Sequence, residues 1–295
     1  MKLSNNKNDI VYLKLNMKKI FPSLLLLLLI APLITSAHQP RITESRQTDV
    51  IDPEISKAYY AQLTGVPDVY TIRTSTPFDL YVGVLVPDIA GQKKDITATI
   101  TKDGQLLTVL NGPEFTWTKM FEPFGYDHYW TGPEYKARAD AGTYVITVTN
   151  IGNDSKYSLA IGEIEHFNFK ETVNALQLIP QLKSSFFNES PINFILSPFG
   201  WGLILILYVL AGIIGLLYRF SLRRLAKSTN RQASKNIGTV DRLSRLLLSL
   251  ALLLWAITTT WNPVLIFFSG FTLFEALFSW CGLYAALGKN TCPIE

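Results

Sequence analysis

The sequence predicts a multi-domain membrane protein, in which an extracytoplasmic antiparallel β-sandwich is followed by three transmembrane α-helices. Three observations predict this fold class. Of the 295 residues, 48% are hydrophobic and 17% are charged, and the apolar residues are clustered. Residues 38–165 show the two-residue alternation of strands. Residues 194–287 contain apolar stretches of the length that a membrane span requires.

Residues 1–37 are predicted to be a signal peptide. Two lysines precede the apolar run 24–34, and small residues follow at 35–37, which is the order of a secretory signal. We expect cleavage after Ala37. A translation start at Met17 is one alternative, because a more ordinary signal sequence begins there, and an uncleaved N-terminal anchor is another.

Residues 38–165 are predicted to form the extracytoplasmic sandwich. Apolar and other residues alternate along 79–86 and 143–149. An Asp-Gly pair at 103–104 lies between two apolar runs, which predicts a tight hairpin. At least six strands fit this region, which favours an antiparallel sandwich. The region has no cysteine, so its stability must come from burial of apolar surface.

The end of this region resembles a known module. Its residues are Ala-Gly-Thr-Tyr at 141–144, continued to Val148, and Lys-Tyr-Ser-Leu at 156–159 after a turn. The pattern resembles the terminal hairpin of bacterial pre-peptidase C-terminal β-sandwich modules, over some twenty residues. The resemblance implies a secreted accessory or binding module.

Residues 115–135 are unusually aromatic and supply the candidate ligand-binding residues Trp117, Tyr126, His128 and Trp130. Flat rings with a few polar groups suit a sugar or peptide. Alternatively, Gly125, Gly132 and Pro133 make this segment a long crossover loop whose aromatics seal the sandwich. One histidine beside loosely spaced acids does not make a metal site, and no nucleophile elbow is present. We therefore predict no metal and no catalytic residue.

Residues 166–193 are predicted to be a stalk or interfacial helix. Apolar residues recur at helical spacing from 169 to 179, and Pro180 is expected to end the helix. Phe186 and Phe187 would then lie near the lipid headgroups or pack under the sandwich.

Residues 194–220 are predicted to be the first transmembrane helix, and 221–245 a basic loop. Residues 219–245 contain eight Lys or Arg and a single acid, Asp241, which places the loop in the cytoplasm. Anionic lipid headgroups are the expected contact. Nucleic acid is excluded as a partner, because the loop is short and lacks interleaved aromatics. Residues 246–287 form a hairpin turning at Asn262-Pro263, and the tail 288–295 is cytoplasmic.

The block that begins at Asn236 resembles a family. Its residues are Asn-Ile-Gly at 236–238, Asp241, Arg242 and Arg245, then Cys281, Leu-Tyr at 283–284, Gly288 and Asn-Thr-Cys-Pro at 290–293. The block is similar to the YgaP-like transmembrane domain of bacterial inner-membrane proteins, although Gly282 stands where Pro is expected. Members of the family can carry a rhodanese domain with a loop cysteine as nucleophile. The chain's only cysteines are Cys281 and Cys292, so this activity does not carry over.

Three residues of the membrane region are candidate functional residues: Glu275, Cys281 and Cys292. Glu275 is expected midway along the last span, where a carboxylate needs a partner. It would serve a relay or a contact with another membrane protein, or it would be protonated and bonded to Ser249, Ser269, Ser279 or a second copy. The cysteines would support metal, persulfide or disulfide chemistry, or would only pack.

Two functions follow from the sequence. The first is a membrane-anchored extracytoplasmic binding or assembly module in a bacterial inner (plasma) membrane, with a periplasmic N-terminal domain and a cytoplasmic C-terminus. The second is a thiol-dependent redox or sulfur-handling unit, or a transport accessory, that uses Glu275, Cys281 and Cys292. The sequence favours a non-enzymatic role and predicts no cofactor. The expected partners are the lipid bilayer and either a membrane protein or a second copy, and the ligand of the exported domain stays open.

Overall fold

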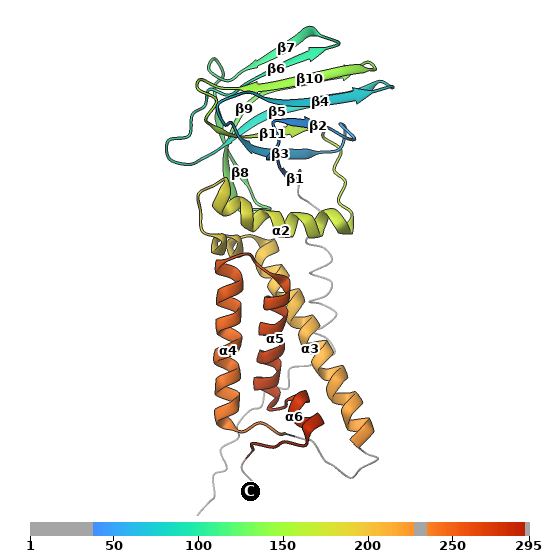
Figure 1. Cartoon of the computed structure of the whole chain (residues 1–295), viewed down its shortest axis with the longest axis vertical. Coiled ribbons are helices and arrows are strands. Elements are labelled where there is room, and N and C mark those ends of the chain that lie inside the picture. The colour runs from blue at the N-terminus through green and yellow to red at the C-terminus, as the bar shows by residue number, and fades with distance from the viewer. Residues whose placement is uncertain (1–37, 227–234, 293–295) are drawn as a thin grey trace, which may run out of the picture. The chain divides into compact units, whose positions relative to one another are not determined.

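The structure is a computed structural model that describes residues 38–226 and 235–292. The predicted signal peptide therefore lies outside the described residues. Figure 1 shows strands in the first part of the described chain and helices in the second. The strands are β1 (Gln39–Ile42), β2 (Gln47–Asp49), β3 (Lys57–Gln62), β4 (Asp68–Thr74), β5 (Phe78–Pro87), β6 (Thr97–Lys102), β7 (Gln105–Asn111), β8 (Thr118–Glu122), β9 (Asp127–Ala139), β10 (Gly142–Thr149) and β11 (Lys156–Ile161).

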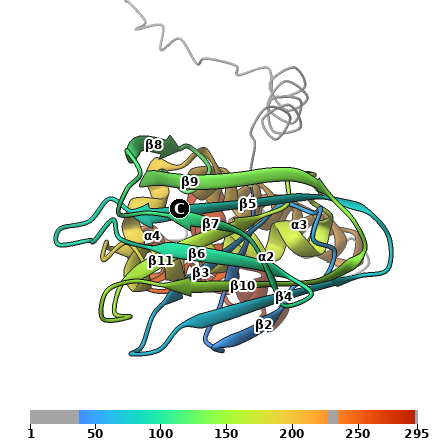
Figure 2. The ribbon, with the colours of Figure 1, turned by 90° about the horizontal axis from the view of Figure 1, so that it is seen from above.

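The strands form two sheets. The six-stranded sheet has the order β1-β3-β11-β5-β9-β8, and the five-stranded sheet the order β2-β4-β10-β6-β7. Figure 2 shows β6, β10, β4 and β2 following one another across the second sheet. The prediction of a wholly antiparallel sandwich is wrong at one edge of each sheet, because β1 pairs parallel with β3 and β2 pairs parallel with β4. Two-residue alternation sets which face a side chain takes, but not the direction of the neighbouring strand.

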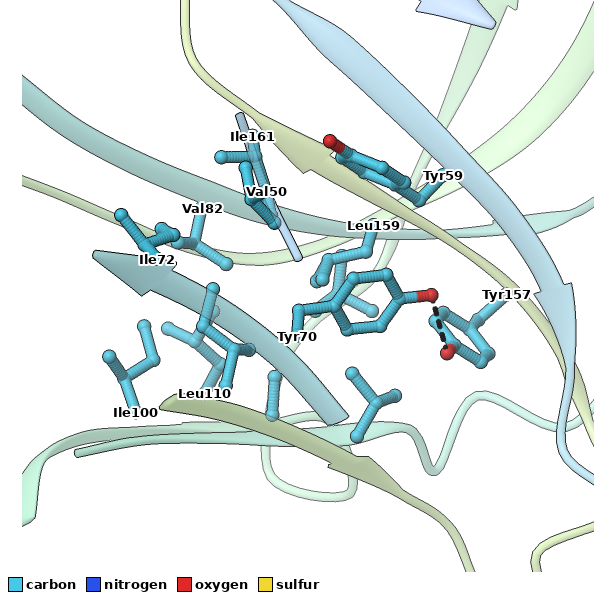
Figure 3. Close-up of a cluster of buried hydrophobic side chains, with 14 of the residues drawn as sticks. Val50, Tyr59, Tyr70, Ile72, Val82, Ile100, Leu110, Tyr157, Leu159 and Ile161 are labelled. Carbon is cyan, nitrogen blue, oxygen red and sulfur yellow. Dashed lines mark hydrogen bonds between the residues drawn. The ribbon is translucent and has the colours of Figure 1, made fainter. Parts of the chain in front are cut away.

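The two sheets enclose one apolar core. The alternation predicted for 79–86 is confirmed, since Leu80, Val82, Val84 and Val86 are all buried. Figure 3 shows side chains of both sheets meeting in the core, among them Tyr70 and Tyr157, whose hydroxyls lie 2.9 Å apart. The Tyr157 hydroxyl donates to a carboxylate oxygen of Asp68 at 2.8 Å. The core therefore satisfies its few polar groups internally.

The predicted Asp-Gly hairpin is confirmed between β6 and β7. Asp103 has φ of 48° and Gly104 has φ of 82°. Positive φ at both central residues matches the twist of the two strands that the turn joins.

The aromatic segment is a strand pair, so the predicted crossover loop is wrong. β8 and β9 are antiparallel, and Gly132 and Pro133 lie inside β9. The pairing of β5 with β9 shifts between Gly83 and Leu85, and this irregularity accommodates the proline, which has no N–H to donate. A Cβ at Gly132 would lie 2.5 Å from the ring of Trp117, so glycine allows that ring to cover the strand.

Helix α2 (Phe169–Ser185) follows the sandwich, and Pro180 lies within it. The prediction that Pro180 ends the helix is wrong. Pro180 removes one backbone hydrogen bond, but buried contacts of Ile179 and Leu182 hold the next turn in place. Phe186 packs on Tyr60, with ring centroids 5.0 Å apart, so of the two alternatives for the Phe186–Phe187 pair the structure favours packing under the sandwich.

The remaining helices are the 3₁₀ helix η2 (Pro191–Leu196), α3 (Pro198–Ala226), α4 (Thr239–Thr258), α5 (Pro263–Phe278) and α6 (Gly282–Leu287). Among the described residues, α3 is the one helix that is itself long and apolar enough to cross a membrane, with mean hydropathy 2.4 over 18 consecutive residues within Pro198–Leu222. The predicted first span, 194–220, therefore begins in η2 and continues in α3. The predicted basic loop 221–245 is shorter than expected, because α3 extends to Ala226 and α4 begins at Thr239.

The predicted turn at Asn262-Pro263 is confirmed, because the Asn262 side chain accepts from the backbone N–H of Val264 and caps α5. The stretch 264–287 is not one helix, however. Ser279 has φ of 51° and ends α5 before α6 begins. Glu275 consequently lies in the last turn of α5 and not midway along a span.

Helix α5 packs against both α3 and α4, and Figure 1 shows the three helices running side by side. The hydroxyls of Tyr208 on α3 and Ser269 on α5 lie 2.7 Å apart. Ser249 on α4 and Ser269 each donate to the other's carbonyl oxygen, at 2.9 and 2.8 Å. Hydroxyls thus join the three helices where their surfaces are buried.

Candidate functional site

Two of the three residues singled out in the membrane region, Glu275 and Cys281, lie together at the end of the α4–α5 hairpin. We call the group around them the hairpin-end cluster; its residues are Asn236, Arg242, Arg245, Glu275, Cys281, Tyr284 and Thr291. The left-handed conformation of Ser279 turns the chain after α5. The side chain of Asn236 then hydrogen-bonds both backbone groups of Cys281. The Asn236 amide donates to the Cys281 carbonyl at 2.9 Å and accepts from the Cys281 N–H at 2.8 Å.

The C-terminal tail closes over the same group. The Thr291 N–H donates to the carbonyl of Asn236 at 3.2 Å, and the Gly238 N–H donates to the Thr291 hydroxyl at 3.1 Å. A Cβ at Gly238 would lie 2.3 Å from the Thr291 carbonyl oxygen, so this close approach requires glycine. The Thr291 hydroxyl in turn donates to Asp241 at the start of α4. The residues at both ends of the recognised block therefore meet in space.

Glu275 is paired with Arg245. One guanidinium nitrogen lies 2.5 Å from a carboxylate oxygen, and the Glu275 side chain is 7% exposed. The guanidinium also lies over the ring of Tyr284, 5.3 Å from its centroid. The serine partners expected for Glu275 are wrong for Ser249 and Ser269, because these two bond to each other. Arg245 is the partner that sequence reasoning missed; as the last charge before the apolar run of α4, it could have been found.

The structure brings Glu275 and Cys281 together but leaves Cys292 with other neighbours. The Cys281 thiol lies close to the Glu275 carboxylate and is buried. The Cys292 sulfur lies 3.8 Å from the carbonyl oxygen of Ile237. Both cysteines are free thiols, so no disulfide joins them in this structure.

The four candidate ligand-binding aromatics have different partners. Trp117 donates its indole N–H to the carbonyl of Gly112 at 2.9 Å, and Trp130 donates to Asp88 at 2.8 Å. Tyr126 and His128 lie at the β8–β9 turn, each with its ring about 5 Å from that of Phe121. The two tryptophans pack against the sandwich core, as the structural alternative requires.

A second cluster of charged groups joins the sandwich to α2. We call it the junction, and its residues are Glu122, Asp127, Lys183 and Glu189. The Lys183 side chain is fully buried, and its ammonium lies 2.5 Å from the Asp127 carboxylate and 3.5 Å from Glu189. It also donates to the carbonyl of Tyr126 at 2.9 Å. Sequence reasoning missed Lys183, which lies on the same helical face as the apolar residues 179, 182 and 186.

Burial shifts the pKa values of two acidic side chains in the junction. It raises the pKa of Glu122 to about 7, although the N–H groups of Phe124 and Gly125 donate to the carboxylate and oppose the shift. Burial also raises the pKa of Asp127, which the charge of Lys183 opposes. In the described ranges 38–226 and 235–292, no group of three or more His, Cys, Asp or Glu side chains could hold a metal ion.

The junction continues into the C-terminal helices. The Ser197 hydroxyl, just before α3, donates to the carbonyl of Phe124 at 2.6 Å, and the ring of Phe199 lies 3.8 Å from that of Phe124. Trp261, at the α4–α5 turn, donates its indole N–H to the carbonyl of Pro191 at 2.8 Å. The β8–β9 turn, η2 and the helical hairpin are therefore in direct contact.

Solved structures similar to this chain include a domain of a collagenase and a domain of a glucanase. One is the pre-peptidase C-terminal domain of a collagenase from Bacillus anthracis, with 11% identity over 44% of this chain and 98% of that chain, and a TM-score of 0.23. Another is the catalytic domain of a GH87 α-1,3-glucanase in complex with nigerose, with 18% identity over 37% of this chain and 23% of that chain, and a TM-score of 0.21. No curated protein matches the chain.

The family comparison concerns the C-terminal part of the chain. It covers residues 233–295, which include α4, α5, α6 and the whole hairpin-end cluster. The matching family is described as inner membrane protein YgaP-like, transmembrane domain, so the resemblance of the block beginning at Asn236 is confirmed, and the chain carries this membrane domain at its C-terminal end.

Proposed function

We propose that this chain is a three-span inner-membrane protein that holds an extracytoplasmic sandwich at the membrane as a binding or assembly module. The observation that carries the proposal is the way the sandwich is attached to the helices. Two buried contacts, Lys183 with Asp127 and Trp261 with Pro191, connect it through α2 and η2 to the helical hairpin. A module mounted in this way presents its surface at a fixed distance from the bilayer.

The distribution of side chains on α4 and α5 supports two further spans. Large apolar side chains on α4 are exposed, among them Leu247 and Trp255 at 58% and 59%. Ser249, in the middle of α4, is buried against α5. Apolar side chains facing outward and polar ones facing inward suit a lipid environment, in which exposed leucines carry no penalty. The 16 residues of α5 span about 24 Å, so its end at Glu275 lies near one membrane face.

The distribution of Lys and Arg supports an orientation with the sandwich outside the cytoplasm. The connection between α3 and α4 is rich in Lys and Arg, which favours the cytoplasm. The Trp261–Pro191 contact places the α4–α5 turn beside η2, at the sandwich end of α3. With the sandwich outside, the hairpin-end cluster and both cysteines then face the cytoplasm.

The thiol-dependent alternative has less support. Cys281 is buried and its backbone is held on both sides by Asn236, while Cys292 lies against Ile237. A reactive thiol needs access to its substrate as well as a favourable charge environment. The described contacts of Cys281 instead fit a role in closing the end of the hairpin.

Site-directed photocrosslinking of the full chain in native membranes tests the proposal. A benzophenone amino acid would replace Phe121, Ile51 or Leu106 on the sandwich, with Trp255 on α4 as the matched lipid-facing control. We expect a discrete protein adduct from at least one sandwich position and none from Trp255. Absence of any protein adduct from the sandwich positions would overturn the binding-module proposal.

A further inference from the structure

We propose that β7 and the groove beside it bind an extended polypeptide segment with alternating apolar and basic side chains, which adds to the five-stranded sheet as a new strand. This inference rests on the proposed function, because it names the partner class of the binding module. Three observations support it: the unprotected edge at β7, the groove that adjoins this edge and the glutamates that line the groove.

The four edge strands of the sandwich differ in how well they resist strand addition. β1 has four residues and contains Pro40 and Arg41, and β2 has three residues. β8 has five residues and carries Lys119 and Glu122. Short length, proline and charge on an edge oppose pairing with another chain. These three edges are therefore protected.

The β7 edge lacks these protections. It has seven residues, Gln-Leu-Leu-Thr-Val-Leu-Asn, with no charge and no proline. Within the described part of the chain, it pairs with β6 alone. Leu106 and Val109 are 65% and 44% exposed. A long, apolar edge of this kind offers a row of backbone donors and acceptors to an incoming strand.

A groove of about 600 Å³ adjoins this edge. Residues 108–111 of β7 form one side, and Phe115 and residues 131–135 of β9 contribute to the rest. Side chains of an added strand point alternately to opposite faces, so its basic side chains would reach the groove while its apolar ones lie beside the exposed Leu106 and Val109. Phe115 and Pro133 in the groove lining offer apolar surface to the aliphatic stems of the basic side chains.

The charge of the groove selects the partner. Its lining includes Glu114 and Glu134, and no Lys, Arg or His is among the described lining residues. The nearest lysines of β8 and β9 are already paired, Lys119 with Asp88 at 2.8 Å and Lys136 with Glu163 at 2.7 Å. An incoming segment therefore gains from basic side chains next to the two glutamates. The β7 strand of a second copy lacks basic residues, so it does not match this groove.

The test uses the full chain in lipid nanodiscs and a fluorescent, end-capped peptide, Thr-Val-Lys-Val-Arg-Val-Thr. Fluorescence anisotropy measures its binding. We expect saturable binding that Val109→Lys weakens by at least about tenfold, because a lysine on the edge repels the peptide and blocks the apolar contact. Ile151→Lys, an equally polar change at another exposed apolar position, should leave binding unchanged. If Val109→Lys does not fold, Glu114→Lys takes its place with the same expectation.

Two altered peptides separate strand addition from charge attraction. Replacing the central Val by Pro removes a backbone donor, and replacing Lys and Arg by Glu reverses the charge; each should weaken binding by about tenfold. Equal binding of the proline peptide, or of the wild-type peptide to Val109→Lys, would overturn the proposal. Dimerisation of the chain that Val109→Lys abolishes would overturn it in favour of a second copy. Adducts at Phe121 or Ile51 without peptide binding would leave the binding module standing and reject only the β7 assignment.

Discussion

The junction and the hairpin-end cluster each bury an ion pair, but they satisfy it in different ways. Lys183 and Asp127 join α2 to the sandwich, and Arg245 and Glu275 join α4 to α5, each across 2.5 Å. The Lys183 side chain is fully buried and has two further oxygen neighbours, the Tyr126 carbonyl and Glu189. The Arg245 side chain is 19% exposed and lies over an aromatic ring. A fully buried ammonium thus needs several oxygen neighbours, whereas a planar guanidinium at a helix end can use one acid and a ring.

The largest effect is expected at the junction, from Lys183→Met. Methionine keeps the apolar stem but leaves the Asp127 carboxylate buried without its cation. Removing one partner of a buried pair costs about 3–5 kcal/mol, so we expect the free energy of unfolding to fall by that amount. Denaturant unfolding of the full chain in detergent micelles, followed by near-ultraviolet circular dichroism, measures it.

Lys170→Met is the matched control, because Lys170 lies on the same helix and is exposed. We expect it to change stability by less than about 0.5 kcal/mol. Adding Asp127→Asn to Lys183→Met should recover part of the loss, since the unpaired charge is then removed. Equal stability of Lys183→Met and the wild-type chain would show that the buried pair does not hold α2 on the sandwich.

The second prediction concerns Arg245→Leu in the hairpin. It leaves Glu275 without its cation, but Arg245 is partly exposed, so water can approach the carboxylate in the variant. We therefore expect a smaller loss than at the junction, about 2–3 kcal/mol, in thermal unfolding of the full chain in nanodiscs. Lys289→Leu is the control, because Lys289 shares the Tyr284 ring but is exposed.

The double variant Arg245→Leu with Glu275→Leu tests whether the hairpin-end cluster still needs an ion pair once neither charge is left unpaired. Lipid and packed helices accept leucine, so we expect the double variant to regain most of the stability that Arg245→Leu loses. A double variant as unstable as Arg245→Leu would mean that the hairpin depends on the ion pair for its geometry.

The sequence predicted regular elements better than their contacts. The alternation of Leu80 to Val86 and the Asp-Gly pair at 103–104 act locally, so they placed β5 and the β6–β7 hairpin correctly. Pro180 and Pro133 were read as breaks, because local rules do not include the tertiary contacts that retain a helix or a strand around a proline. Glu275 was identified as important, but its partner lies 30 positions earlier, and a single sequence does not specify pairs at that distance.

The smallest expected effect is the change of unfolding free energy with pH that Glu122 causes. It tests whether burial shifts the pKa of an acid in the junction. Burial raises its folded-state pKa to about 7, from an ordinary value of 4.5. Between these values the folded chain binds more protons than the unfolded chain, so this carboxyl's contribution to stability falls as pH rises from 4.5 through 7. Asp127 strengthens the shift and Lys183 weakens it.

Glu122→Gln removes this titration while keeping the size of the side chain. Below about pH 4.5 the difference in unfolding free energy between variant and wild type should be constant, set by the altered bonds to the Phe124 and Gly125 N–H groups. Between pH 5 and 8 the wild type should lose about 1 kcal/mol relative to the variant, since partial exposure screens the charge. Denaturant unfolding across this range measures the difference. A difference that stays flat would mean that Glu122 is solvated in the folded chain, and that among the junction acids only Asp127 experiences the burial that distinguishes this region from the hairpin end.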